Sequence, residues 1–133
     1  MHYVKDKNSN KLAILVKPRD WKIGLDFITD EHEFLQVGTW YYSKGKVLDR
    51  HHHNFVERQT DITQECVTVM QGSLNVEIYD EDKLLVEEYI MSEGDFSVFL
   101  KGGHAYEILE DNTRILETKN GPFLGVEKDK TRF

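Results

Sequence analysis

Short runs of apolar and β-branched residues, separated by Gly, Asn and Asp, make up most of the chain. In "SLNVEIYD" the alternation places Leu74, Val76 and Ile78 on one face, which is typical of a half-buried strand. About nine strands are expected on this basis. They lie at residues 11–18, 24–30, 33–45 with a continuation over 47–53, 65–72, 73–80, 84–95, 96–103, 104–111 and 113–122. The nearest helical candidate, residues 28–36, supports one turn at most.

Many short strands without a helix predict an all-β protein whose antiparallel strands form a barrel or a double-sheet jelly roll. The 133 residues are expected to form a single domain over 1–133. The first strand, residues 11–18, ends at Pro18 and is a candidate for adding to the sheet of a second copy, because exposed sheet edges are usually covered by pairing. We therefore expect a homodimer.

Charge and composition exclude several classes of partner. The formal net charge is −7 and there is no dense basic cluster, so neither nucleic acid nor an anionic membrane surface is an expected partner. The chain has no apolar stretch long enough to cross a bilayer and no recognisable signal peptide, and Cys66 is its only cysteine. A cytoplasmic location and a small-molecule ligand or substrate are the expectations that follow.

Three consecutive histidines, half of the six in the chain, are the most distinctive chemical feature. On a strand, His51 and His53 share one face and His52 points to the other. Two neutral imidazoles on one face can bind the same first-row metal ion. An isolated His-x-His pair is also common on a polar, solvated strand end, so the pair needs support from elsewhere in the chain.

Glu65 and His104 supply that support. Glu65 alternates with Val67 and Val69, and a carboxylate on a core face is costly to bury unless something pairs with it. His104 follows a Gly-Gly turn at the start of a predicted strand. Three histidines and one glutamate can therefore converge from three strands.

This arrangement resembles the cupin superfamily over roughly residues 36–119. The first cupin motif, G(X)5HXH(X)3–4E(X)6G, is matched at its two ends by Gly45 with His51-x-His53 and by Glu65 with Gly72. The second motif, G(X)5PXG(X)2H(X)3N, is matched by Gly94 and by "LKGGH" at 100–104. The chain departs from the pattern in an eleven-residue gap between His53 and Glu65, in Leu100 at the proline position, in one residue missing before His104, and in the absent closing Asn.

The resemblance implies a double-stranded β-helix with its core at about residues 36–119. It also implies one divalent metal, Fe, Mn, Ni or Zn, held by His51, His53, Glu65 and His104. Glu57 stands at the usual short spacing from the histidines and is the rival to Glu65 as the carboxylate ligand. The tail "ETKNGPFLGVEKDKTRF" is similar to that of small cupins from bacterial surface-polysaccharide or sugar-nucleotide pathways.

Metal-assisted isomerisation or epimerisation of a small sugar-like or oxo-acid substrate is the function that we expect, since the metal would keep an open position; the ligand set itself does not distinguish this chemistry from that of a dioxygenase. Tyr106, which shares a face with His104, and Glu117 and Lys119, which share a face on the last strand, are the candidate catalytic residues. An Fe(II)-dependent dioxygenase, a metal-free sugar-nucleotide ketoisomerase and a non-catalytic binding module are the alternatives.

Overall fold

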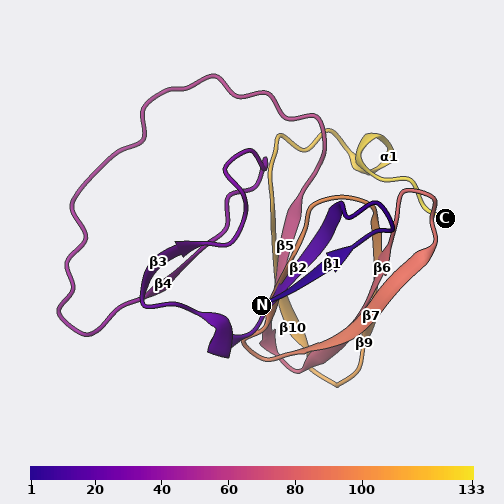
Figure 1. Cartoon of the computed structure of the whole chain (residues 1–133), viewed down its shortest axis with the longest axis horizontal. Coiled ribbons are helices and arrows are strands. Elements are labelled where there is room, and N and C mark those ends of the chain that lie inside the picture. The colour runs from indigo at the N-terminus through magenta and orange to yellow at the C-terminus, as the bar shows by residue number, and fades with distance from the viewer.

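The computed structural model describes all residues from Met1 to Phe133 and is nearly all-β (Figure 1). The strands are β1 (His2–Lys5), β2 (Lys11–Val16), β3 (Gly24–Phe27), β4 (Gly38–Tyr41), β5 (Glu65–Gln71), β6 (Ser73–Tyr79), β7 (Leu85–Ser92), β8 (Phe96–Phe99), β9 (Gly103–Ile108) and β10 (Arg114–Lys119). A 3-10 turn spans Pro18–Asp20 and a single helical turn, α1, spans Val126–Asp129. The helices lack the length and apolar character that crossing a membrane would require.

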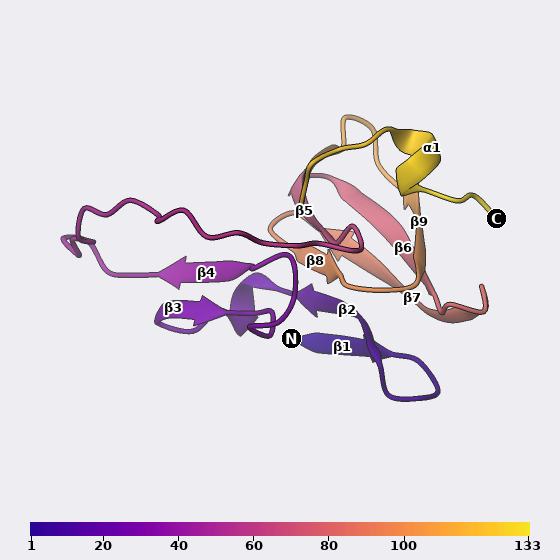
Figure 2. The same ribbon diagram turned by 90° about the horizontal axis from the view of Figure 1, so that it is seen from above.

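The strands form three antiparallel sheets. The largest has the order β1-β2-β8-β5-β10, and a second has the order β7-β6-β9. The third contains only β3 and β4 and projects from the side of the body (Figure 2). The predicted all-β class is confirmed, and the two larger sheets form an open sandwich in which β9 and β10 each lack a neighbour on one side.

The larger core lies between the two main sheets, and its pattern follows the alternation of the strands. It contains Val67 and Val69 of β5 and, opposite them, residues of β6 that are at most 1% exposed: Leu74, Val76 and Ile78. Val4 and Leu12 also belong to it, so the core extends beyond the expected 36–119 and includes the N-terminal hairpin.

A smaller core covers the other face of the five-stranded sheet. Cys66, which alternates with Glu65 and Val67, packs there with Ile28 and Phe96. Burial raises the pKa of the Cys66 thiol to about 11, so the thiol stays protonated and inert at neutral pH. Cys66 is therefore a packing residue of this smaller core.

The expected strand over residues 47–53 is absent. After β4 the chain makes a long excursion, residues 42–64 (the 42–64 loop), that contains no strand and swings away from the rest of the molecule (Figures 1 and 2). A strand exists only where its backbone N–H and C=O groups find a partner, and no strand lies beside this segment. Sequence alternation alone does not supply that partner.

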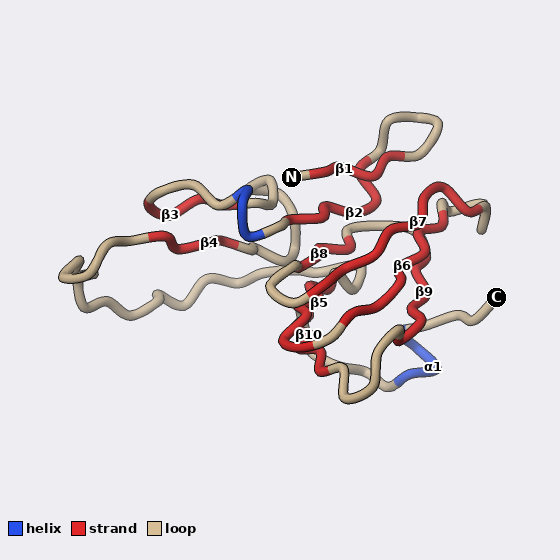
Figure 3. The backbone as a smooth tube through the Cα atoms, turned by 90° about the horizontal axis from the view of Figure 1, so that it is seen from below, coloured by secondary structure: helices blue, strands red, loops and turns tan.

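The expected role of residues 11–18 as an exposed edge is also wrong. β2 lies between β1 and β8, so both of its edges are already paired, and β1 is the edge strand of the sheet (Figure 3). β2 therefore lies inside the sheet, and its residues Leu12 to Val16 are all buried. The homodimer itself stays a prediction.

Candidate functional site

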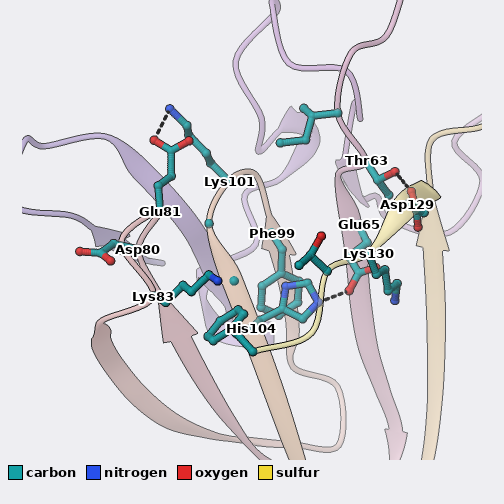
Figure 4. Close-up of a pocket in the computed structure, with 15 residues that line it drawn as sticks. Thr63, Glu65, Asp80, Glu81, Lys83, Phe99, Lys101, His104, Asp129 and Lys130 are labelled. Carbon is teal, nitrogen blue, oxygen red and sulfur yellow. Dashed lines mark hydrogen bonds and ion pairs between the residues drawn. The ribbon is translucent and has the colours of Figure 1, made fainter. Parts of the chain in front are cut away.

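A cavity of about 430 Å³ opens where β5, β8 and β9 meet the C-terminal tail (Figure 4). Most of the residues that line it are polar or charged. Fifteen residues line it: Ile62, Thr63, Glu65, Asp80, Glu81, Lys83, Phe99, Lys101, Gly102, Gly103, His104, Asp129, Lys130, Thr131 and Phe133. Two predicted site residues, Glu65 and His104, therefore lie in the wall of the same cavity.

Glu65 is the centre of this site. It begins β5 on the face of Val67 and Val69, and its side chain is only 4% exposed. Its Oε1 atom lies 2.7 Å from His104 Nε2 and accepts a hydrogen bond of 3.2 Å from the Tyr106 hydroxyl. Figure 4 shows His104 and Glu65 pointing toward one another across the cavity wall. The buried carboxylate thus has the partners that its location demands.

The ionised form of Glu65 is favoured in spite of burial. Burial alone raises the pKa of the carboxyl, but the hydrogen bond and charge of His104, the charge of Lys130 and the hydrogen bond of Tyr106 together lower it below its ordinary value. Glu65 is therefore a carboxylate at neutral pH, the form that binds a cation.

Tyr106 follows His104 by two residues on β9, and both rings pack against Phe99. Burial, followed by the charge of Glu65 and the hydrogen bond to it, raises the pKa of the Tyr106 phenol far above its ordinary value. The phenol consequently stays protonated at neutral pH. It can donate a hydrogen bond, but it cannot serve as a general base.

The register of β10 brings Glu117 and Lys119 to the same face. Glu117 pairs with Val67 and Lys119 pairs with Glu65, so both side chains lie on the inner face of the sheet. Lys119 Nζ lies 2.8 Å from a Glu117 oxygen and 3.9 Å from Glu65 Oε2. The hydrogen bond to Glu117 raises the pKa of Lys119, so this ammonium stays charged at neutral pH.

Lysines that the sequence did not single out give the cavity much of its charge. Lys101 forms an ion pair of 2.9 Å with Glu81, Lys83 Nζ lies 5.5 Å from the centre of the Phe133 ring, and Lys130 reaches the site from the C-terminal tail. In Figure 4, Lys83 and Lys101 lie on one side of His104 and Lys130 lies on the other. No spacing or motif links these lysines, because they come from two turns and a tail that only the fold brings together.

The histidine pair is not at this cavity. His51 and His53 are exposed in the 42–64 loop, with their ring centres 5.4 Å apart. His51 Nδ1 lies 3.0 Å from the carbonyl oxygen of Asp49, so a donating Nδ1 would leave Nε2 free as a ligand. Glu57, the rival carboxylate, is exposed in the same loop. The structure thus brings together Glu65, His104, Tyr106, Glu117 and Lys119, but it leaves both loop histidines and Glu57 apart from them.

A second group of potential ligands is Asp30, His32 and Glu33. Asp30 is ion-paired with Lys11 at 2.5 Å, and Glu33 accepts a hydrogen bond from Gln64. These carboxylates already have partners, and His32 is as exposed as its polar surroundings in the sequence suggest.

Comparisons of the chain with protein-family models, with curated proteins and with solved structures found no match. The geometry of the Glu65 cavity is therefore the basis for assigning a function.

Proposed function

We propose that the chain is a small metal-binding protein of the cupin type that isomerises or epimerises a small anionic substrate at the Glu65 cavity. The observation that carries the proposal is the buried, ionised carboxylate of Glu65, which faces His104 and Tyr106 from the core side of the sheet. The open edge between β9 and β10 supports a jelly roll that the histidine segment would close.

The donor set fits a divalent first-row metal. Glu65 and His104 offer a carboxylate oxygen and an imidazole nitrogen that already lie 2.7 Å apart. His51 and His53 would add two more imidazoles once the 42–64 loop lies against the cavity. Three imidazoles and one carboxylate suit Fe, Mn, Ni or Zn and leave room for a substrate atom.

A bound metal would supply Lewis acidity toward a carbonyl or hydroxyl oxygen of the substrate. Lys83, Lys101 and Lys130 would hold a carboxylate or phosphate group of that substrate by charge. Tyr106 would donate a hydrogen bond to a substrate oxygen on which negative charge develops. Glu117, which is linked to Glu65 through the Lys119 ammonium, would carry a proton away.

A metal-free ketoisomerase is the second candidate, because the direct contact between His104 and Glu65 favours it. The Glu65 carboxylate, 2.7 Å from His104 Nε2, orients the ring, so that His104 could act as an acid–base group without a metal. In that case His104 would move the proton and the lysines would bind the sugar nucleotide's phosphates.

Elemental analysis of protein purified without a histidine tag separates the two candidates. We expect close to one first-row metal per chain, and we expect thermal stability to rise when metal is returned to chelator-treated protein. As a matched control, a variant with H51A and H53A should bind far less metal and should show no such rise. Wild-type protein that is metal-free and cannot be reloaded would contradict the metal proposal and favour the ketoisomerase.

A further inference from the structure

The open edge of the sandwich exposes residues that face its interior. On β9, His104, Tyr106 and Ile108 stand beside the buried Ile78, Val76 and Leu74 of β6, and so they lie on the inner face. Tyr106 is nevertheless 38% exposed and Ile108 56% exposed. β9 pairs only with β6, so no strand lies along its other edge. An inward-facing strand that stays half exposed indicates that one further strand belongs beside it.

The 42–64 loop contains a segment with the pattern that this edge requires. In an extended conformation, Val47, Asp49, His51, His53 and Phe55 share one face, and His52 belongs to the opposite face. Phe55 is 97% exposed and Val47 is 78% exposed, which places them among the most exposed apolar side chains of the chain. Laid along β9 with the histidines inward, the segment would bury both apolar side chains and bring both imidazoles to the Glu65 cavity.

The charges of the 42–64 loop and of β9 also favour pairing between them. The 42–64 loop carries four basic and three acidic side chains, a net charge of +1 in a chain whose net charge is −7. The outward-facing side of β9 carries Glu107, and Glu110 and Asp111 follow the strand. Arg50, on the opposite face of the segment from His51, is the residue that would meet these carboxylates.

The exposed apolar face of the β3–β4 hairpin indicates that the segment beside β9 comes from a second copy and not from the same chain. Leu25 of β3 pairs with Trp40 of β4, and these residues share a face with Phe27; their exposed fractions are 47%, 57% and 60%. A two-stranded sheet with an uncovered apolar face is at best marginally stable in water. The hairpin and the 42–64 loop project together, away from β9 (Figure 2). Folding the loop back onto its own β9 would leave the hairpin uncovered, whereas a second copy seated there would cover it.

We propose that two copies of the chain exchange their 42–64 loops, so that residues 47–55 of each copy pair with β9 of the other and deliver His51 and His53 to its Glu65 cavity. The exchange is symmetric, as an isologous dimer requires, and each site is then built from both copies. The identity of the ligands rests on the proposed metal function, but the exchange of the segment does not.

Chemical cross-linking tests the exchange without any metal. A chain carrying H52C and E107C, both outside the site, is treated with a short bismaleimide; Cys66 is buried and does not react. We expect a covalent dimer on a denaturing gel, and neither single-cysteine variant should give it in comparable yield. A cross-link confined to the monomer would show pairing within one chain, and the absence of a link would show no pairing with β9. Either result would overturn the proposal.

Complementation between copies tests the shared site. One differently tagged copy carries H51A and H53A, the other carries E65Q and H104Q, and the mixed dimer is isolated after co-expression. Exchange predicts one intact site and half of the wild-type metal content per dimer. A mixed dimer without metal, beside a wild-type protein that binds metal, would overturn the exchange. A wild-type protein without metal would instead contradict the proposed function and leave the cross-linking result to decide the exchange.

Discussion

Replacing Glu65 with glutamine is expected to lower the affinity for a divalent metal by more than about 100-fold, since even the loss of a supporting contact to a ligand typically costs 10–100-fold. The amide has nearly the shape of the carboxylate but lacks its charge, so the buried position is filled while the anionic ligand is lost. Isothermal titration of chelator-treated protein with Zn²⁺ or Mn²⁺ measures the change.

Glu57 provides the matched control. It is the other carboxylate at cupin-like spacing, and it is exposed in the 42–64 loop, so Glu57→Gln should leave the affinity within about 2-fold of the wild-type value. If Glu57→Gln abolished binding and Glu65→Gln did not, Glu57 would be the ligand and our assignment would be wrong.

Glu65→Gln should also change how the free energy of unfolding depends on pH. Because the folded protein lowers the pKa of Glu65 below its ordinary value of 4.5, the carboxylate stabilises the fold above about pH 4.5, and this contribution disappears as the pH falls through the folded-state pKa. In the presence of chelator, Glu65→Gln should therefore be less stable than wild type at pH 7, by about 1–3 kcal/mol. Urea unfolding should show the two curves converging in acid. A difference that stayed constant with pH would contradict the lowered pKa.

A substitution of Gly102 by alanine is expected to have the largest effect on the fold. Gly102 precedes β9 with a φ of +78°, and a Cβ atom there would lie 2.3 Å from the backbone carbonyl oxygen of Tyr79. Left-handed strain of about 1–2 kcal/mol adds to a steric cost of about 1–3 kcal/mol, so we expect a loss of about 3 kcal/mol. Thermal or urea unfolding measures it.

Gly125→Ala separates strain from steric overlap. Gly125 also has a positive φ, +101°, but a Cβ atom there would meet nothing within 4 Å. With a ψ of 149° it lies in a region adopted almost only by glycine, so its substitution should cost only the conformational part, about 1–3 kcal/mol. Equal losses in the two variants would contradict the close packing of Gly102 on Tyr79.

The sequence predicts well what depends on neighbours along the chain. Alternation in β6 correctly places Leu74, Val76 and Ile78 in the core, and alternation in β5 places Glu65 with the core valines. The sequence places Glu117 and Lys119 on one face, and strand register shows that this face is the inner one, since β10 pairs these residues with Val67 and Glu65. Register depends on pairing between distant strands, and a single strand's pattern does not encode it.

What the sequence missed depends on contacts between distant segments. Lys83, Lys101 and Lys130 reach the cavity from separate turns and the tail, with no periodicity to mark them. Residues 47–53 place His51 and His53 on one face if they are extended, but the single chain provides no neighbouring strand for them. A segment whose strand partner comes from a second copy would lack a partner in the single chain in this way.

X-ray absorption at the edge of the bound metal tests most directly whether the histidine pair joins the Glu65 cavity. We expect a spectrum that fits three imidazole ligands together with carboxylate oxygen, and we expect the imidazole number to fall to one in the variant with H51A and H53A. A wild-type spectrum with a single imidazole, unchanged in that variant, would show that His51 and His53 are not ligands and would contradict the site proposed for this protein.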